Sequence, residues 1–334
     1  MATTHEPEGN GETLSYAEHD KLGPLASKNS QLHDPVELRA KLIAEFQAAV
    51  AAAKDAAASV DRSAETAVHD ARKALRRGRA VLAMIAHALP KNERRAVRDA
   101  LQEARRSLSM VRDHTVAPTT LGGLSLEDDD RDTAKRVLDS AAEALPPTAE
   151  IKQLLAEAAT RAAAQAEALV AALPPAVDES VLFDGIAETY AEARKARRKA
   201  KSSKAWFHTW RRRTKELVYE LEFLAKHAGA RASAIHEELG AVSDTLGPAV
   251  DMIMSRDFVQ THGQGIGDDA IDHLRKTIDK RLDDAMKSAR KDARDAFAQK
   301  PKKFVKRLVK SVKRDLTPAD DNARETDEIE RAMD

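Results

Sequence analysis

The chain has 334 residues, of which only 4% are aromatic, 13 are glycine and 12 are proline, while Ala, Leu and charged residues are abundant. This composition favours helices, because Ala, Leu, Glu, Lys and Arg are good helix formers. The absence of cysteine excludes disulfides, thiolate metal sites and cysteine nucleophiles, and it indicates a reducing compartment such as the cytoplasm. Because no stretch approaches about 18 consecutive apolar residues, no membrane span is expected.

The formal net charge is zero, but the charge is unevenly distributed along the chain. Residues 1–35 carry a net charge of −4 and residues 315–334 carry −6, so residues 36–314 carry +10. A basic body attracts anions, which predicts an anionic partner. Both acidic ends are expected to be disordered, and the first has no apolar segment that would indicate an export signal.

The first half of the basic body is predicted to form helices separated by turn residues. Asp34-Pro35 is a typical helix start, Pro90 interrupts the pattern, and Pro118 is expected to end the third helix region. The run from Asp128 to Asp130 can cap the next helix. The expected helices span residues 36–58, 63–89, 92–114, 128–145 and 148–173.

The second half is predicted to follow a boundary at Pro174-Pro175, because consecutive prolines disfavour helix at and before themselves. The stretch from 247 to 267 contains several glycines and is expected to be loose. No strand pattern is found, so we expect an all-α domain with halves at about 36–173 and 176–314. The expected helices of the second half span residues 178–201, 203–228, 231–246, a long segment from 268, and a basic segment from 301 that ends before Pro318.

A basic stripe marks the second expected helix and is repeated in the second half. At 100° per residue, His69, Arg72, Arg76 and Arg79 fall within an arc of about 80° beside an apolar arc. Residues of the same kind recur 139 positions later, which predicts an internal duplication whose two stripes face a common axis. The matched pairs are His69 with His208, Arg72 with Arg211, Lys73 with Arg212, and Arg76 with Lys215.

Three further basic rows occur at helical spacing and could extend a binding surface. For any one row a solvated helix face is the commoner explanation. The last row also fits an ordinary amphipathic helix or a helix on a membrane surface. The rows are Arg98 and Arg105; Arg194, Arg197, Arg198 and Lys201; and Lys303, Lys306 and Lys310.

The two stripes resemble the CHAD family, the conserved-histidine α-helical domain, whose hallmark is His-x-x-Arg-x-x-x-Arg/Lys in two halves. The likeness spans about residues 36–314. It implies two four-helix bundles related by pseudo-twofold symmetry, with basic residues lining a central groove or channel that binds inorganic polyphosphate, and it implies association with polyphosphate granules. Val218 stands where the first copy has Arg79, so the second stripe is expected to be weaker.

The residue types suit this ligand. Arg donates bidentately to phosphate oxygens, Lys adds a mobile positive charge, and protonated His can donate as well. Polyphosphate binding without catalysis, metal or cofactor is therefore the preferred interpretation, and the identity of any protein partner stays open.

Other interpretations remain open at this point. His69 and His208 could be core histidines, and Arg112-Asp113 favours an internal ion pair. Trp206 and Trp210 are expected to pack rather than to stack on bases, which disfavours a nucleic-acid-binding helical protein. A scaffold that docks an acidic protein would use the same charges. A metal-dependent phosphohydrolase is disfavoured, because the His-Asp dipeptides at 19–20, 33–34 and 69–70 form no obvious metal cage.

Overall fold

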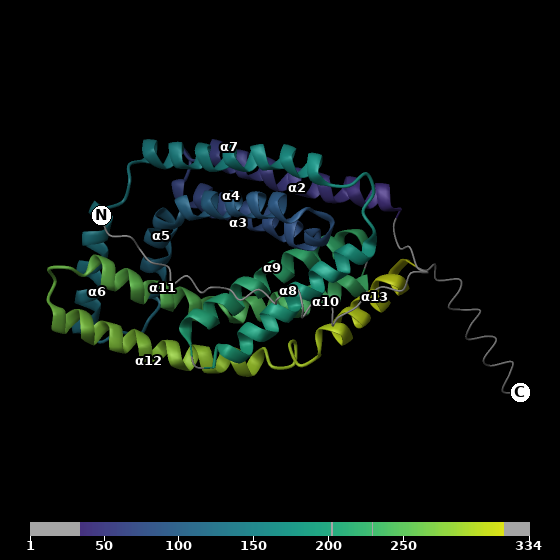
Figure 1. The fold of residues 1–334 in the computed structure, drawn as a ribbon. Helices are drawn as coiled ribbons and strands as arrows, with labels where there is room; N and C mark the ends of the chain where they lie inside the picture. Colours follow the sequence, from purple (N-terminus) through teal and green to yellow (C-terminus); the bar gives the residue numbers. More distant parts are fainter. Residues whose placement is uncertain (1–33, 202, 229, 317–334) are drawn as a thin grey trace, which may run out of the picture.

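The computed structural model describes residues 34–201, 203–228 and 230–316, and every regular element in these ranges is a helix (Figure 1). The all-α prediction is therefore confirmed. The two acidic ends expected to be disordered lie almost wholly outside the described residues. No described helix combines the length and apolar character needed to cross a membrane.

Four helices of the first half pack into one group. Asp34 begins the group as predicted, since its carboxylate accepts the backbone N–H groups of Val36 and Glu37 at 2.9 Å each. Leu42 and Phe46 are fully buried and place the apolar face of the first helix against its neighbours. The group consists of α2 (Pro35–Ala58), α3 (Ala64–Met84), α4 (Lys91–Ser107) and α7 (Thr148–Ala172).

Four helices of the second half form a corresponding group around an aromatic core. Tyr190 stacks on Phe304 with ring centroids 4.0 Å apart, and Trp210 is fully buried, which confirms its expected packing role. Gly185 allows a close approach to the first half, because a Cβ there would lie 2.5 Å from the carbonyl oxygen of Met84. The group consists of α8 (Glu179–Lys199), α9 (Lys204–Ala228), α10 (Ala230–Thr245) and α13 (Pro301–Leu316).

The remaining helices of both halves form a third group with its own apolar cluster, seen at the left of Figure 1. Phe258 and Ile278 from the second half pack with Leu121 and Val137 from the first. The two four-helix groups that were expected are thus present, one from each half, and the third group was not expected. The third group consists of α5 (Ser109–Gly122), α6 (Asp128–Glu143), α11 (Gly247–His262) and α12 (Asp268–Asp292).

Two predicted breaks are wrong. Pro118 lies inside α5, and the helix continues to Gly122 because Ala117 and Leu121 are buried in the third group. Of the stretch expected to be loose, residues 247–262 form α11, whereas residues 263–267 are irregular as expected. Gly247 and Pro248 occupy its first positions, where a helix needs no internal N–H donor. Tertiary packing therefore overrides the breaker signal at Pro118, whereas Gly247 and Pro248 are compatible with a helix start.

The order of helices in the second half repeats that of the first, with α8 to α13 following α2 to α7. At the centre α3 packs against α9. Internal duplication itself stays a prediction.

Candidate functional site

The contact between α3 and α9 brings the two predicted basic stripes together. Val68, Leu75 and Leu82 are buried on α3, and the stripe lies on the adjoining face, as the helical periodicity indicated. Arginines of α4 and α5 approach the same region. We call this set the central cluster: Arg72, Arg76 and Arg79 of α3, Arg105 of α4, Arg112 of α5, and Arg211, Arg212 and Lys215 of α9.

The guanidinium groups of the central cluster repel one another across the α3–α9 contact. Burial, together with the charges of Arg105, Arg112 and Arg76, lowers the pKa of Arg72 to about 9. Burial also lowers the pKa of Arg212 to about 10, with contributions from Arg213 and Arg79. A pKa this low for arginine means that the surrounding residues stabilise the positive charge poorly.

Several members of the central cluster also have an unused hydrogen-bond donor. Buried guanidinium Nε atoms normally find an acceptor, because an unpaired buried donor costs about 1–3 kcal/mol. Among the described residues, none is found for the Nε atoms of Arg76, Arg79, Arg211 and Arg212. These four donors come equally from α3 and α9. The cluster is therefore a place where an added anion would find both charge and donors.

Arg213, next to the central cluster, shows what a neutralised arginine looks like in this fold. Its Nε lies 2.7 Å from a carboxylate oxygen of Glu192, and its Nη1 lies 2.6 Å from Glu216. These two carboxylates raise the pKa of Arg213 although the side chain is buried. Arg213 is therefore a structural residue of the α8–α9 contact, and its neighbour Arg212 faces the cluster.

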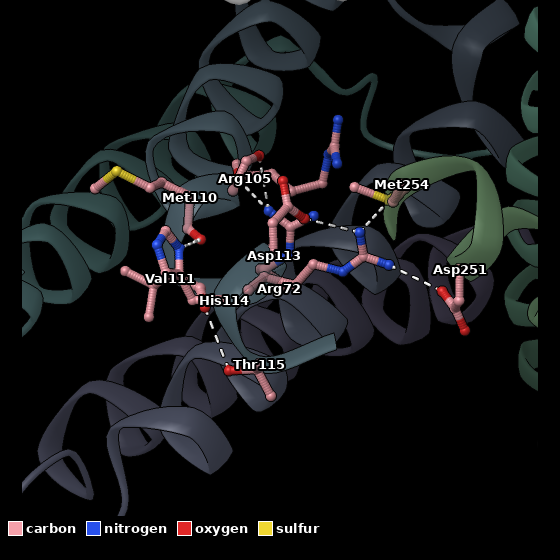
Figure 2. A network of polar contacts seen from close by, with 11 residues as sticks. Arg72, Arg105, Met110, Val111, Asp113, His114, Thr115, Asp251 and Met254 are labelled. Atoms are coloured by element: carbon pink, nitrogen blue, oxygen red, sulfur yellow. Dashed lines mark hydrogen bonds and ion pairs between the residues drawn. The ribbon is translucent and has the colours of Figure 1, made fainter. Parts of the chain in front are cut away.

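At the other end of the cluster, polar contacts connect α3, α5 and α11 (Figure 2). Arg72 Nη1 donates to the carbonyl oxygen of Arg105 at 2.7 Å and to Ser109 Oγ at 3.0 Å. Arg112 pairs with Asp113 at 3.0 Å, which confirms the predicted ion pair, and with Asp251 of α11 at 3.2 Å. This end of the cluster thus contains carboxylates from both halves.

The other residues of the two stripes lie around this buried set. His69 and Lys73 are exposed on α3, and His208 is half-buried on α9. Lys215 Nζ lies 3.9 Å from Asp244 and 5.7 Å from the ring centroid of Tyr219, and burial lowers its pKa. The stripes therefore present a row of buried and half-buried arginines with His69 and Lys73 at an exposed margin.

The three additional basic rows have different surroundings. Arg105 belongs to the central cluster, whereas Arg98 is exposed and bonds Asp99. Arg194 Nε donates to the carbonyl oxygen of Phe297 at 3.1 Å, and Arg197 Nη2 to that of Arg290 at 3.5 Å. These two arginines therefore bind the backbone at the α12 end and in the connection to α13, and Arg198 and Lys201 of the same row are exposed.

The row on α13 is the exposed face of an amphipathic helix. Lys303, Lys306 and Lys310 are exposed, whereas Phe304 and Leu308 on the opposite face are buried. Figure 1 shows α13 at the end of the molecule opposite α6. The row therefore does not join the arginines between α3 and α9.

The sequence did not identify the carboxylates that partly neutralise the cluster. Asp251 lies 139 residues after Arg112, the spacing that relates the two stripes, so the repeat itself could have pointed to this position. Glu192 and Glu216 gave no such signal. In the described segments, no three His, Asp or Glu side chains gather where they could hold a metal ion.

Comparisons with known proteins bear on the whole arrangement. The crystal structure of the CHAD domain from the plant Ricinus communis matches with a TM-score of 0.54 and 17% identity, over 76% of this chain and 91% of that chain. No curated protein matches the chain. The family model described as "CHAD domain" matches residues 42–260, which include both stripes, α5 and most of α11. The chain therefore belongs to the CHAD domain family.

Proposed function

We propose that this chain binds inorganic polyphosphate at the central cluster, without catalysing a reaction, and that it associates in the cytoplasm with granules of this polymer. The observation that carries the proposal is the set of four buried Nε donors without an acceptor, two on α3 and two on α9. A chain of phosphates supplies acceptors and negative charge at every repeat, so it can meet all four donors.

The charge of the site supports the same ligand. The eight cations of the central cluster are opposed by few carboxylates, among which Asp113, Asp244 and Asp251 each pair with one of its members. Burial and mutual repulsion depress the pKa of Arg72 and Arg212. A bound polyanion would relieve both effects, because opposite charge stabilises the cationic form.

The surroundings favour a polymer without bases. Trp210 is fully buried, and the half-buried Trp206 is covered by Lys199, whose Nζ lies 4.2 Å from the ring centroid. Neither ring is presented as a free stacking platform of the kind that single-stranded nucleic acids use. The site also uses arginine rather than a sequence-reading element, which suits a uniform polymer.

The test is a calorimetric titration of the full chain with long-chain polyphosphate at two salt concentrations, with duplex DNA and an acidic polypeptide as competitors. We expect tight binding that weakens steeply with salt, as counterion release requires, and that the two competitors displace poorly. Equal displacement by DNA would assign the cluster to nucleic acids, and preferential displacement by the polypeptide would assign it to an acidic protein. Hydrolysis of the polymer by the protein would contradict the non-catalytic proposal.

A further inference from the structure

Asp251 places a carboxylate among arginines of three different helices. Its Oδ1 lies 3.2 Å from Arg112 Nη2 of α5. Its charge also acts on Arg76 of α3 and Arg211 of α9, where it opposes the lowering of both pKa values by burial. The carboxylate therefore lies where these three guanidinium groups converge, at the junction of the two halves.

The position of Asp251 in the repeat sets it apart from the other acids. It follows Arg112 by 139 residues, so the second half has a carboxylate where the first half has a guanidinium. Its side chain is 32% exposed, so it can turn toward water without unpacking α11. Glu216, in contrast, is buried and held by Arg213. Asp251 thus lies centrally among the arginines, and its side chain can move away from them into solvent.

We propose that Asp251 is an internal competitor that makes the central cluster selective for long polyanions over short ones. Its carboxylate holds the place of one phosphate group, and a ligand too short to bind elsewhere in the cluster must displace it. This inference rests on the proposed function and adds a selectivity device to it.

The selectivity follows from the cost of displacing a tethered group. A side chain fixed near its partners acts at an effective concentration in the millimolar range or above, so a short phosphate chain competes with it poorly. A long chain can bind through Arg79 and Arg212 and the exposed margin at His69 and Lys73 while Asp251 stays in place, so it avoids most of the displacement cost. Removal of the carboxylate should therefore help short chains much more than long ones.

Asp244 offers a matched control on the same half of the molecule. Its carboxylate lies 3.9 Å from Lys215 Nζ, and its side chain is 81% exposed. A pair this open contributes little in water and is a weak competitor. Asp244→Asn removes the same charge from the neighbourhood without freeing the position among Arg76, Arg112 and Arg211.

The experiment titrates the full chain and its variants with tripolyphosphate and with long-chain polyphosphate at one fixed salt concentration. For Asp251→Asn we expect tripolyphosphate affinity to rise about tenfold, the scale of one charge-assisted hydrogen bond, while long-chain affinity rises less than about threefold. Asp251→Glu keeps the charge and should keep the wild-type ratio of affinities. Asp244→Asn should change either affinity less than about twofold.

Each outcome decides the inference. Unchanged or weaker tripolyphosphate binding by Asp251→Asn, or an equal gain for both ligands, overturns it. Asp251→Ser provides a second charge-free variant if the first fails to fold, as judged by circular dichroism and melting temperature. Absence of long-chain binding by the wild type overturns the proposed function instead, and a gain in tripolyphosphate binding by Asp251→Asn still decides whether the carboxylate competes for the site.

Discussion

Arg212→Met should raise the stability of the protein and weaken polyphosphate binding at the same time. Burial, together with the charges of Arg213 and Arg79, lowers the pKa of Arg212 to about 10. At roughly 1.4 kcal/mol per pKa unit, a charged guanidinium whose pKa lies this far below the ordinary arginine value destabilises the fold by about 3 kcal/mol. Methionine fills similar space without charge, so part of this penalty should disappear.

The sign of the effect follows from proton linkage. Because the pKa of Arg212 is lower in the folded chain than in the unfolded chain, the penalty is complete below about pH 10 and shrinks only as the pH rises toward the unfolded value. At pH 7 the variant should therefore gain about 1–3 kcal/mol in free energy of unfolding, after allowance for relaxation around the new side chain. Its affinity for long-chain polyphosphate should fall about tenfold or more, since one charge-assisted contact is lost.

Urea unfolding at pH 7 measures the first effect and calorimetric titration the second. Arg95→Met is the matched control, because Arg95 is 75% exposed and pairs only loosely with Asp99 at 3.5 Å. Its free energy of unfolding should change by less than about 0.5 kcal/mol. A clear loss of stability in Arg212→Met, or unchanged polyphosphate affinity, would refute the view that this arginine is kept charged and strained for a ligand.

Three further predictions concern other buried or bonded groups. Burial raises the pKa of Glu220 well above its usual range, so the stabilising effect of its protonated form is complete below about pH 4.5 and is lost as the pH rises. In urea unfolding, Glu220→Gln should therefore be about 1–2 kcal/mol more stable than wild type at pH 7.5 and equally stable near pH 4.5. The hydrogen bond that His273 donates to the carboxylate of Asp130 raises the pKa of His273, so this pair should stabilise the α6–α12 contact below about pH 6.5 and lose that effect at higher pH. Asp130→Asn should abolish this part of the melting-temperature change between pH 6 and 8. Tyr190 donates to two backbone carbonyl groups between α12 and α13 at 3.1 and 3.2 Å, so Tyr190→Phe should cost about 1 kcal/mol and speed amide exchange in residues 293–300, and unchanged exchange would contradict this role.

Much of the fold was predictable because helix-forming composition and breakers mostly agree with the packing. The stripes on α3 and α9 were found for a physical reason, since 3.6-residue periodicity places Arg72, Arg76 and Arg79 on one face. Their mutual approach follows from the packing of α3 on α9. The unexpected third group arises because burial of Leu121 offsets the cost of Pro118 within α5, and because Gly247 and Pro248 begin α11, whose Phe258 packs in the same cluster.

The site was less predictable than the fold. Spacing shows that basic residues share a helix face, but it does not show what that face meets. Arg194 and Arg197 share a helix face, but that face meets another part of the chain, so their side chains donate to backbone carbonyl groups and do not line an open surface. Asp251 was missed because it lies in the stretch expected to be loose, and only the formation of α11 places it beside Arg112.

The most direct test compares two double variants in titration with long-chain polyphosphate. Arg72→Ala with Arg211→Ala removes two cations of the central cluster, and Lys303→Ala with Lys306→Ala removes two exposed cations of α13. We predict that the first pair weakens binding by about 3 kcal/mol or more and lowers the slope of log affinity against log salt by about 2, with helix content unchanged. We predict that the second pair changes binding by less than about 1 kcal/mol. Equal losses from both pairs, or a larger loss from the α13 pair, would contradict polyphosphate binding between α3 and α9.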